Sequence, residues 1–186
     1  RGLGDVYKRQ AQHRVDLEAM TGAINDATRL VFVCNPNNPT GTTITTAEWD
    51  AFMSRVPAHV TVALDEAYFE YNRAQDTPVA TEEILKYPNV VGLRTFSKAY
   101  GLAGVRVGYA FGPAELIEGI NKVAVPFSVS SVAQAGAIAS LEARDELAVR
   151  VEETCAQRSR LTDALKEYGT PESQSCLLYT SPSPRD

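Results

Sequence analysis

The sequence is poor in the residues that build disulfide frameworks, metal centres and polyanion-binding surfaces. It has two histidines and three cysteines, and the cysteines, at positions 34, 155 and 176, lack metal-like spacing, which argues against paired disulfides and a zinc site. The formal net charge is −5 without a basic cluster, so nucleic acid is not expected as a partner. No apolar run reaches the roughly 20 residues that cross a bilayer, and the N-terminus lacks the apolar core of a secretory signal. We therefore predict a cytoplasmic protein that binds no metal and no membrane.

The most informative feature that is present is Lys98, which lies among small and hydroxylic residues in the stretch 95–109 (TFSKAYGLAGVRVGY). An amine in a partly dry site loses some of its preference for the charged form and becomes a nucleophile toward carbonyls. Arg106 follows, and Gly101 and Gly104 permit a tight turn in which its guanidinium approaches an anion such as phosphate. The pattern favours a cofactor with an aldehyde, although alone it is also compatible with an ordinary loop and a solvated lysine.

A second polar segment follows the apolar run 30–34. It reads NPNNPTG over residues 35–41, and its prolines predict a stiff turn where a parallel strand ends. Ligands of open α/β sheets collect at that edge. Asn38 offers a side-chain amide that can donate to a phenolate-type oxygen. Taken alone, the segment is better interpreted as a plain β-turn.

A third segment delivers a carboxylate from the end of an apolar strand. Residues 60–65 (VTVALD) end in Asp65, and Tyr68 follows three residues later. A charge that emerges from a buried strand needs a partner, and a protonated ring nitrogen would supply one. The alternative is that Asp65 caps the next helix.

Together and in this order, the three segments resemble the fold-type I pyridoxal-phosphate aminotransferases, specifically the histidinol-phosphate and aromatic amino acid (phenylalanine-type) group. The match runs from about residue 16 to residue 169 and rests on the motifs NPNNPTG, DEAY and TFSKAYGLAGVRVGY. The resemblance implies an α/β fold, namely a three-layer α/β/α large domain with a mostly parallel sheet, here truncated. It also implies pyridoxal 5'-phosphate as the cofactor, amino acids and 2-oxo acids as substrates, and a homodimeric parent enzyme.

The same resemblance implies catalytic roles for Lys98, Asp65 and Tyr68. Lys98 would form the Schiff base with pyridoxal phosphate and then move the proton between substrate and cofactor. Asp65 would pair with the pyridine nitrogen and keep the ring able to accept electrons. Tyr68 and Asn38 would hydrogen-bond the 3-hydroxyl oxygen of the ring.

The resemblance further implies that Thr95, Ser97 and Arg106 contact the cofactor phosphate. The full set of implied cofactor-binding residues is Asn38, Asp65, Tyr68, Thr95, Ser97, Lys98 and Arg106.

Hydrophobic periodicity and turn residues predict alternating strands and helices. We expect strands at 30–34, 60–65, 90–95 and 107–111, and helices at 16–25, 46–55, 81–86, 113–123, 130–141 and 143–168. Such alternation implies a parallel or mixed sheet with helices on both faces.

Residues 1–10 and 176–186 differ from the rest of the chain. Codons can be chosen for residues 1–10 whose reverse complement encodes residues 176–184, with Arg185 consistent. This inverted repeat resembles a sequencing adapter read at both ends of a short DNA insert. We therefore expect 1–10 and 176–186 to be non-native, 11–142 to be part of a cofactor-binding large domain, and 143–175 to form a long helix leading toward an absent small domain.

The substrate stays open between histidinol phosphate and aromatic amino acids, with 2-oxoglutarate implied as the amino acceptor. The family's upstream phosphate-binding turn and its downstream carboxylate-binding arginine are not found in this stretch, so we expect the fragment itself to be inactive. Two alternatives share the lysine and the aspartate: another fold-type I enzyme, such as a carbon-sulfur lyase or a decarboxylase, or a non-enzymatic pyridoxal-phosphate-sensing regulator domain.

The adapter hypothesis makes a prediction about the encoding DNA. The codons of residues 1–10 and those of residues 176–185 should be reverse complements of one another. Sequencing the gene across both ends checks this, and unrelated codons at the two ends would contradict the hypothesis.

Overall fold

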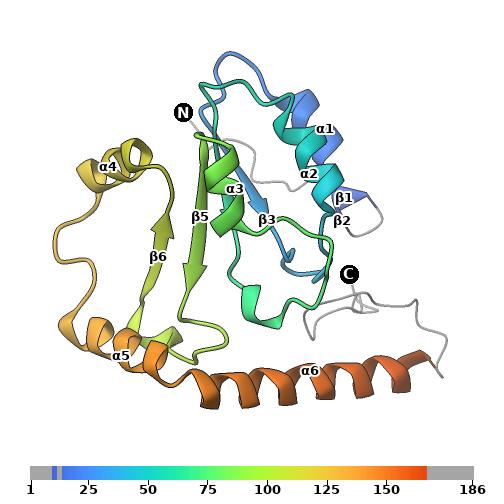
Figure 1. Cartoon of the computed structure of the whole chain (residues 1–186), viewed down its shortest axis with the longest axis vertical. Helices are drawn as coiled ribbons and strands as arrows, with labels where there is room; N and C mark the ends of the chain where they lie inside the picture. The colour runs from blue at the N-terminus through green and yellow to red at the C-terminus, as the bar shows by residue number, and fades with distance from the viewer. Residues whose placement is uncertain (1–9, 12–13, 167–186) are drawn as a thin grey trace, which may run out of the picture.

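A four-stranded mixed sheet forms the centre of the computed structural model, which describes residues 10–11 and 14–166 (Figure 1). The strand order is β3-β4-β5-β6, in which β3, β4 and β5 are parallel and β6 is antiparallel to β5. The strands are β3 (Leu30–Cys34), β4 (Thr61–Asp65), β5 (Val90–Thr95) and β6 (Gly108–Phe111). The predicted α/β class with a mostly parallel sheet is confirmed.

Three short helices accompany the parallel strands: the first precedes β3, while the second and third connect β3 to β4 and β4 to β5. Local capping starts the first two. In α1 (Leu17–Ala23), the Asp16 side chain accepts a hydrogen bond from the Ala19 amide. In α2 (Thr46–Met53), Thr45 and Glu48 form a reciprocal capping box, which satisfies two amides that the first helical turn leaves without partners. The third helix is α3 (Ala80–Lys86). All three lie within a few residues of the predicted helices.

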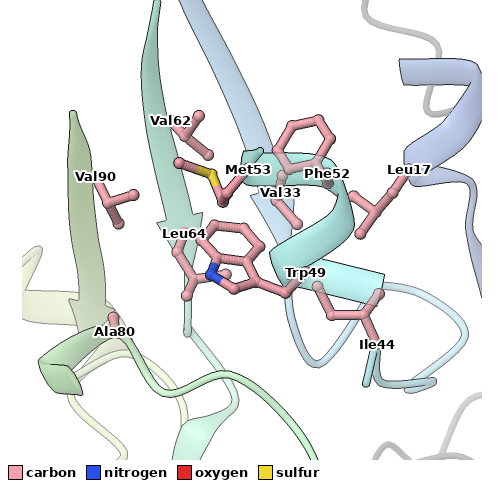
Figure 2. Close-up of a cluster of buried hydrophobic side chains, with 10 residues drawn as sticks. All are labelled: Leu17, Val33, Ile44, Trp49, Phe52, Met53, Val62, Leu64, Ala80 and Val90. Atoms are coloured by element: carbon pink, nitrogen blue, oxygen red, sulfur yellow. The ribbon is translucent and has the colours of Figure 1, made fainter. Parts of the chain in front are cut away.

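The main core lies between one face of the sheet and these helices (Figure 2). Its largest side chain is Trp49 of α2, which is fully buried and packs with residues from β3, β4 and β5. The buried members of the core are Leu17, Val33, Ile44, Trp49, Phe52, Met53, Val62, Leu64, Ala80 and Val90. The Trp49 Nε1 donates to Oε2 of the buried Glu83 at 2.8 Å, so the indole brings its polar group into the core with a partner.

The opposite face of β3 differs from the core face. Side chains alternate along a strand, and Leu30 and Phe32 remain 49% and 59% exposed, whereas Val33 between Phe32 and Cys34 is fully buried. Within the described residues, β3 is therefore covered by helices on its core face only.

The last three helices continue from β6. They are α4 (Ala114–Val123), α5 (Ser131–Glu142) and α6 (Arg144–Lys166). Pro113 stands at the N-cap of α4 rather than at its first helical position, and Ser130 caps α5. Exposed apolar side chains such as Val123, Phe127 and Val132 make this region typical of a surface that contacts protein.

The long helix α6 lies beyond the carboxyl ends of the parallel strands (Figure 1). Its buried Val151 and Cys155 form a second small core with Ala99, and Tyr71 and Leu147 pack against that core. Residue 71 belongs to the 3-10 helix η1 (Phe69–Tyr71). The helix predicted for 143–168 is thus present, and its first half contacts the loops that follow β4 and β5.

The remaining elements are a short antiparallel pair, β1 (Gln10–Ala11) with β2 (Arg14–Val15), and the 3-10 helix η2 (Ala103–Val105). Among the described residues, no helix has the length and apolar character that crossing a bilayer requires. Residues 1–9 and 176–186, most of the predicted adapter-derived ends, lie outside the described residues.

The buried Trp49–Glu83 hydrogen bond makes a prediction about stability. Trp49→Phe should lower the free energy of unfolding by about 2–4 kcal/mol, because it removes buried volume and leaves the Glu83 carboxylate short of a donor. Urea unfolding followed by far-ultraviolet circular dichroism measures the change. His59→Ala, at an exposed position, is the control and should stay within about 0.5 kcal/mol of the wild type; an equally mild Trp49→Phe would contradict the prediction.

Candidate cofactor-binding site

The predicted site residues converge because parallel strands end at one edge of the sheet. Asp65 is the last residue of β4 and Thr95 the last of β5, while Asn38 and Lys98 lie in the loops that follow β3 and β5. Cys34 is in register with Asp65, and Asp65 with Leu93. This is the edge at which open α/β sheets bind ligands.

Asp65 is half-buried, and both its main chain and its side chain accept hydrogen bonds. Its carbonyl accepts the amide of Asn35 at 2.9 Å, and its Oδ1 accepts the amide of Ala67 at 3.0 Å. The next helix, η1, has Tyr68 at its N-cap without a side-chain cap. Asp65 therefore makes a local turn. The alternative interpretation, in which Asp65 caps the next helix, is not supported.

Lys98 and Tyr68 are brought together by the loops after β5 and β4. The Lys98 Nζ lies 5.1 Å from the centroid of the Tyr68 ring, within reach of a cation–π interaction. Lys98 is exposed, whereas its neighbour Ala99 is buried against α6. The expectation of a partly dry lysine is therefore not met among the described residues: the backbone after Lys98 is anchored while the amine faces outward.

The residues predicted for a phosphate lie at the two ends of one loop. Phe96 donates its amide to the carbonyl of Val107 at 3.2 Å, which closes the loop and brings Arg106 back toward the end of β5. There, the Thr95 Oγ1 accepts the Ser97 amide at 3.1 Å. The two hydroxylic residues thus form a compact turn beside the returning chain.

Arg106 has an uncommon backbone conformation for a residue other than glycine, with φ of 57°. Its exposed guanidinium donates from Nη1 to the Ala103 carbonyl at 2.8 Å. This bond uses one of the five donor hydrogens of the guanidinium, so the group can still offer a fork of donors to an anion.

The turn after β3 has two faces, and sequence reasoning identified only one of them. Asn38 is exposed, whereas Asn35 and Asn37 are buried. Asn35 donates from Nδ2 to the Thr77 Oγ1 at 2.8 Å and accepts the Ile44 amide at 3.1 Å. Its position directly after a strand in an Asn-Pro turn was a signal that could have revealed this structural role.

A second feature that sequence reasoning missed is the ion pair between Glu66 and Arg94. The Glu66 carboxylate is almost fully buried, and its Oε2 accepts from the Arg94 Nε at 2.8 Å. Its Oε1 accepts the Ala80 amide at 2.7 Å. Burial raises the pKa of Glu66, and the Ala80 amide and Arg94 oppose that rise.

A hollow of the described surface lies away from these residues. A cavity of about 340 Å³ is bounded by α1, α2 and β2, with Arg14, Asp16 and Glu48 among its polar lining residues. None of the predicted site residues lines it. Within the described residues, no group of three or more acidic, histidine or cysteine side chains has the arrangement of a metal site.

Comparison with known proteins adds the following findings. The family model described as aminotransferase class I and II matches residues 5–182. The aromatic amino acid aminotransferase of Corynebacterium glutamicum (strain R) is 63% identical over 169 residues, covering 91% of this chain and 49% of that protein. The aromatic amino acid aminotransferase of Corynebacterium efficiens is 66% identical over 164 residues, covering 88% of this chain and 47% of that protein.

Solved structures give a similar picture. The histidinol-phosphate aminotransferase of Sinorhizobium meliloti, in complex with pyridoxal-5'-phosphate, is 33% identical with a TM-score of 0.78, covering 89% of this chain and 45% of that one. The chain therefore spans about half the length of the relatives it matches.

The buried Asn35 side chain makes a prediction about the turn after β3. Asn35→Ala should lower the free energy of unfolding by about 1–3 kcal/mol, because the buried Ile44 amide loses its acceptor. Hydrogen exchange at Ile44 should accelerate as well, which mass spectrometry of the peptide covering residues 42–49 detects. Asn25→Ala, at an exposed asparagine that also accepts a backbone amide, is the control; equal exchange in both variants would refute the assigned role.

Proposed function

Because the chain belongs to the class I and II aminotransferases, we propose that it is the cofactor-holding segment of an enzyme that transfers amino groups between aromatic amino acids and 2-oxoglutarate. The observation that carries the proposal is the convergence of Asp65, Lys98 and Tyr68 at the carboxyl ends of β4 and β5. Family membership and the pyridoxal-phosphate complex of the S. meliloti relative indicate pyridoxal 5'-phosphate as the cofactor.

The residues present fit that cofactor. Lys98 provides an accessible amine on one loop, which suits the aldehyde of the cofactor. Asp65 provides a half-buried carboxylate on the neighbouring strand, which suits the basic ring nitrogen. The hydroxyls of Thr95 and Ser97, with the guanidinium of Arg106, match a phosphate. When bound, pyridoxal phosphate supplies an electron-accepting ring that stabilises negative charge on the substrate α-carbon.

Lys98 carries the largest part of the proposed chemistry. Its Nζ would hold the cofactor through the aldehyde group, and the same amine would take up and return the substrate α-proton. The Tyr68 ring beside it restricts where the amine can move. Lys98 thus acts first as an anchor and then as a general base.

Asp65 and the two remaining polar groups orient the ring. A carboxylate beside a ring nitrogen favours the protonated form of that nitrogen, which the proposed chemistry requires. The Tyr68 hydroxyl and the Asn38 amide would donate to the ring's 3-hydroxyl oxygen. Because the Asp65 main chain is bonded to Asn35 and its carboxylate to the Ala67 amide, its orientation is set before any ligand arrives.

The substrate assignment rests on the relatives. The two Corynebacterium proteins named for aromatic amino acids are 63% and 66% identical to this chain, whereas the S. meliloti histidinol-phosphate enzyme is 33% identical. We therefore favour aromatic amino acids over histidinol phosphate. A homodimeric parent enzyme and a cytoplasmic location stay predictions of the sequence.

The proposal predicts where the cofactor attaches. After incubation with pyridoxal phosphate and reduction with borohydride, peptide mass mapping should place the added mass on Lys98. Lys98→Arg should abolish this labelling, because guanidinium does not form the bond under these conditions, while Lys122→Arg on α4 is the control and should leave it unchanged. Equal labelling of several lysines, or labelling that survives Lys98→Arg, would sink the proposal.

The role of Asp65 can be tested by activity in a complete enzyme. Residues 11–175 can replace the aligned stretch of the C. glutamicum aromatic amino acid aminotransferase, and the chimera can then be assayed with phenylalanine and 2-oxoglutarate. Asp65→Asn in this background should reduce cofactor retention and activity together, since a neutral amide cannot hold the ring nitrogen protonated. A fully active Asp65→Asn chimera would contradict the assigned role.

A further inference from the structure

Two charged residues that the proposed chemistry does not use lie directly beside those that it does. Glu66 follows Asp65 at the end of β4, and Arg94 precedes Thr95 at the end of β5, four positions before Lys98. Their carboxylate and guanidinium meet at 2.8 Å, with exposed side-chain fractions of 1% and 15%. This is the most buried of the ion pairs found among the described residues.

The amide and the carboxylate of Glu66 connect the end of β4 to β5 and to α3, while its carbonyl accepts the Phe69 amide of the following turn at 3.0 Å. Its amide donates to the Leu93 carbonyl of β5 at 2.9 Å. Its Oε1 accepts the first amide of α3, and its Oε2 accepts the Arg94 Nε. The residue next to Asp65 is therefore held by β5 and by the helix that covers the core face.

Arg94 is fixed by aromatic rings as well as by Glu66. Its guanidinium carbon lies 3.8 Å from the centroid of the Phe69 ring and 5.3 Å from that of Phe111. Phe69 belongs to η1, directly after Tyr68, and Phe111 ends β6. The planar guanidinium thus connects β5 with both the loop that carries Tyr68 and the edge strand.

A buried ion pair adds little net stability to a fold. Removing two charges from water costs several kcal/mol per ion, and replacing a buried ion pair by apolar groups is often neutral or stabilising. What the pair offers, and apolar packing does not, is a defined direction between two specific atoms. A role in setting geometry therefore explains its presence at this place better than a role in stability.

We propose that Glu66 and Arg94 are positioning residues that fix Asp65 and Tyr68 relative to Lys98. The inference rests on the proposed function, because it assigns these residues to the same cofactor site. Neither side chain touches the cofactor. They act through the main chain: Glu66 through the peptide that carries Asp65, and Arg94 through the strand that leads into Lys98 and through Phe69.

The chain offers a matched control for the test. Glu83 is as buried as Glu66, and its carboxylate also has two partners, the Trp49 Nε1 and the Lys86 Nζ, both at 2.8 Å. It lies on α3 and faces the core rather than the strand ends. Glu66→Gln and Glu83→Gln therefore remove comparable buried charges, one beside the site and one away from it.

The experiment uses the full chain and the C. glutamicum chimera, with pyridoxal phosphate as the probe. Far-ultraviolet circular dichroism gives the folded fraction of each variant, because fluorescence of Trp49 would respond directly to the change at its partner Glu83. Borohydride labelling of Lys98, normalised to that fraction, gives the cofactor concentration for half-maximal labelling. Visible circular dichroism per bound cofactor reports how rigidly the ring is oriented.

Glu66→Gln and Arg94→Gln should each raise the half-labelling concentration about tenfold, as expected for the loss of a buried charged hydrogen bond. Each should also reduce the dichroism per bound cofactor. The double variant should resemble the single ones, because the two residues act as a unit. Arg94→Lys should recover part of the loss, while Glu83→Gln should lower stability and leave both cofactor readouts within about twofold of the wild type.

Two outcomes separate the hypotheses. If the wild-type chain and the chimera show no selective labelling of Lys98, the proposed function fails. If Lys98 is labelled but Glu66→Gln behaves as Glu83→Gln does, the positioning role alone is overturned. Additive effects of Glu66→Gln and Arg94→Gln would likewise contradict it.

Discussion

The candidate site depends on the hydrogen-bonded register between the parallel strands β4 and β5. Asp65 lies opposite Leu93, and the ladder continues one step further, where the Glu66 amide donates to the Leu93 carbonyl. A shift of one residue would turn each side chain to the other face of the sheet. The register therefore decides that Glu66 faces the core and its ion pair, while Asp65 faces the opposite side. Lys98 follows in the loop that begins directly after β5.

The surrounding structure supports this register from two directions. On the core face, Trp49 and the apolar residues of β3, β4 and β5 fill the space beneath α2 and α3. Beyond the strand ends, α6 packs Val151 and Cys155 against Ala99, the residue after Lys98. The exposed Lys98 side chain is thus attached to a backbone that is buried directly beside it, so the chain that carries the amine is held in place.

Among the residues that the structure describes, three of the four buried polar side chains connect different segments of the chain, whereas Asn37 bonds within its own turn. Asn35 joins the turn after β3 to Thr77 and Ile44, Glu66 joins β4 to α3 and Arg94, and Glu83 joins α3 to Trp49. A buried polar group without a partner is costly, so the partners of these three side chains favour the arrangement that brings them together. They give the sheet edge a single arrangement, which apolar packing alone specifies less sharply.

The sequence by itself determined the local features: the positions of strands and helices from periodicity and caps, the turns from Asn-Pro and glycine, and the family from three motifs in order. These follow from neighbouring residues, so a short window contains all the necessary information. Tertiary structure alone decided which side chains meet across segments, including the Glu66–Arg94 pair, the buried roles of Asn35 and Asn37, the exposure of Lys98, and the packing of α6 on Ala99. Those contacts depend on strand register and helix docking, which are set by the packing of the whole core and leave no periodic signal in the sequence.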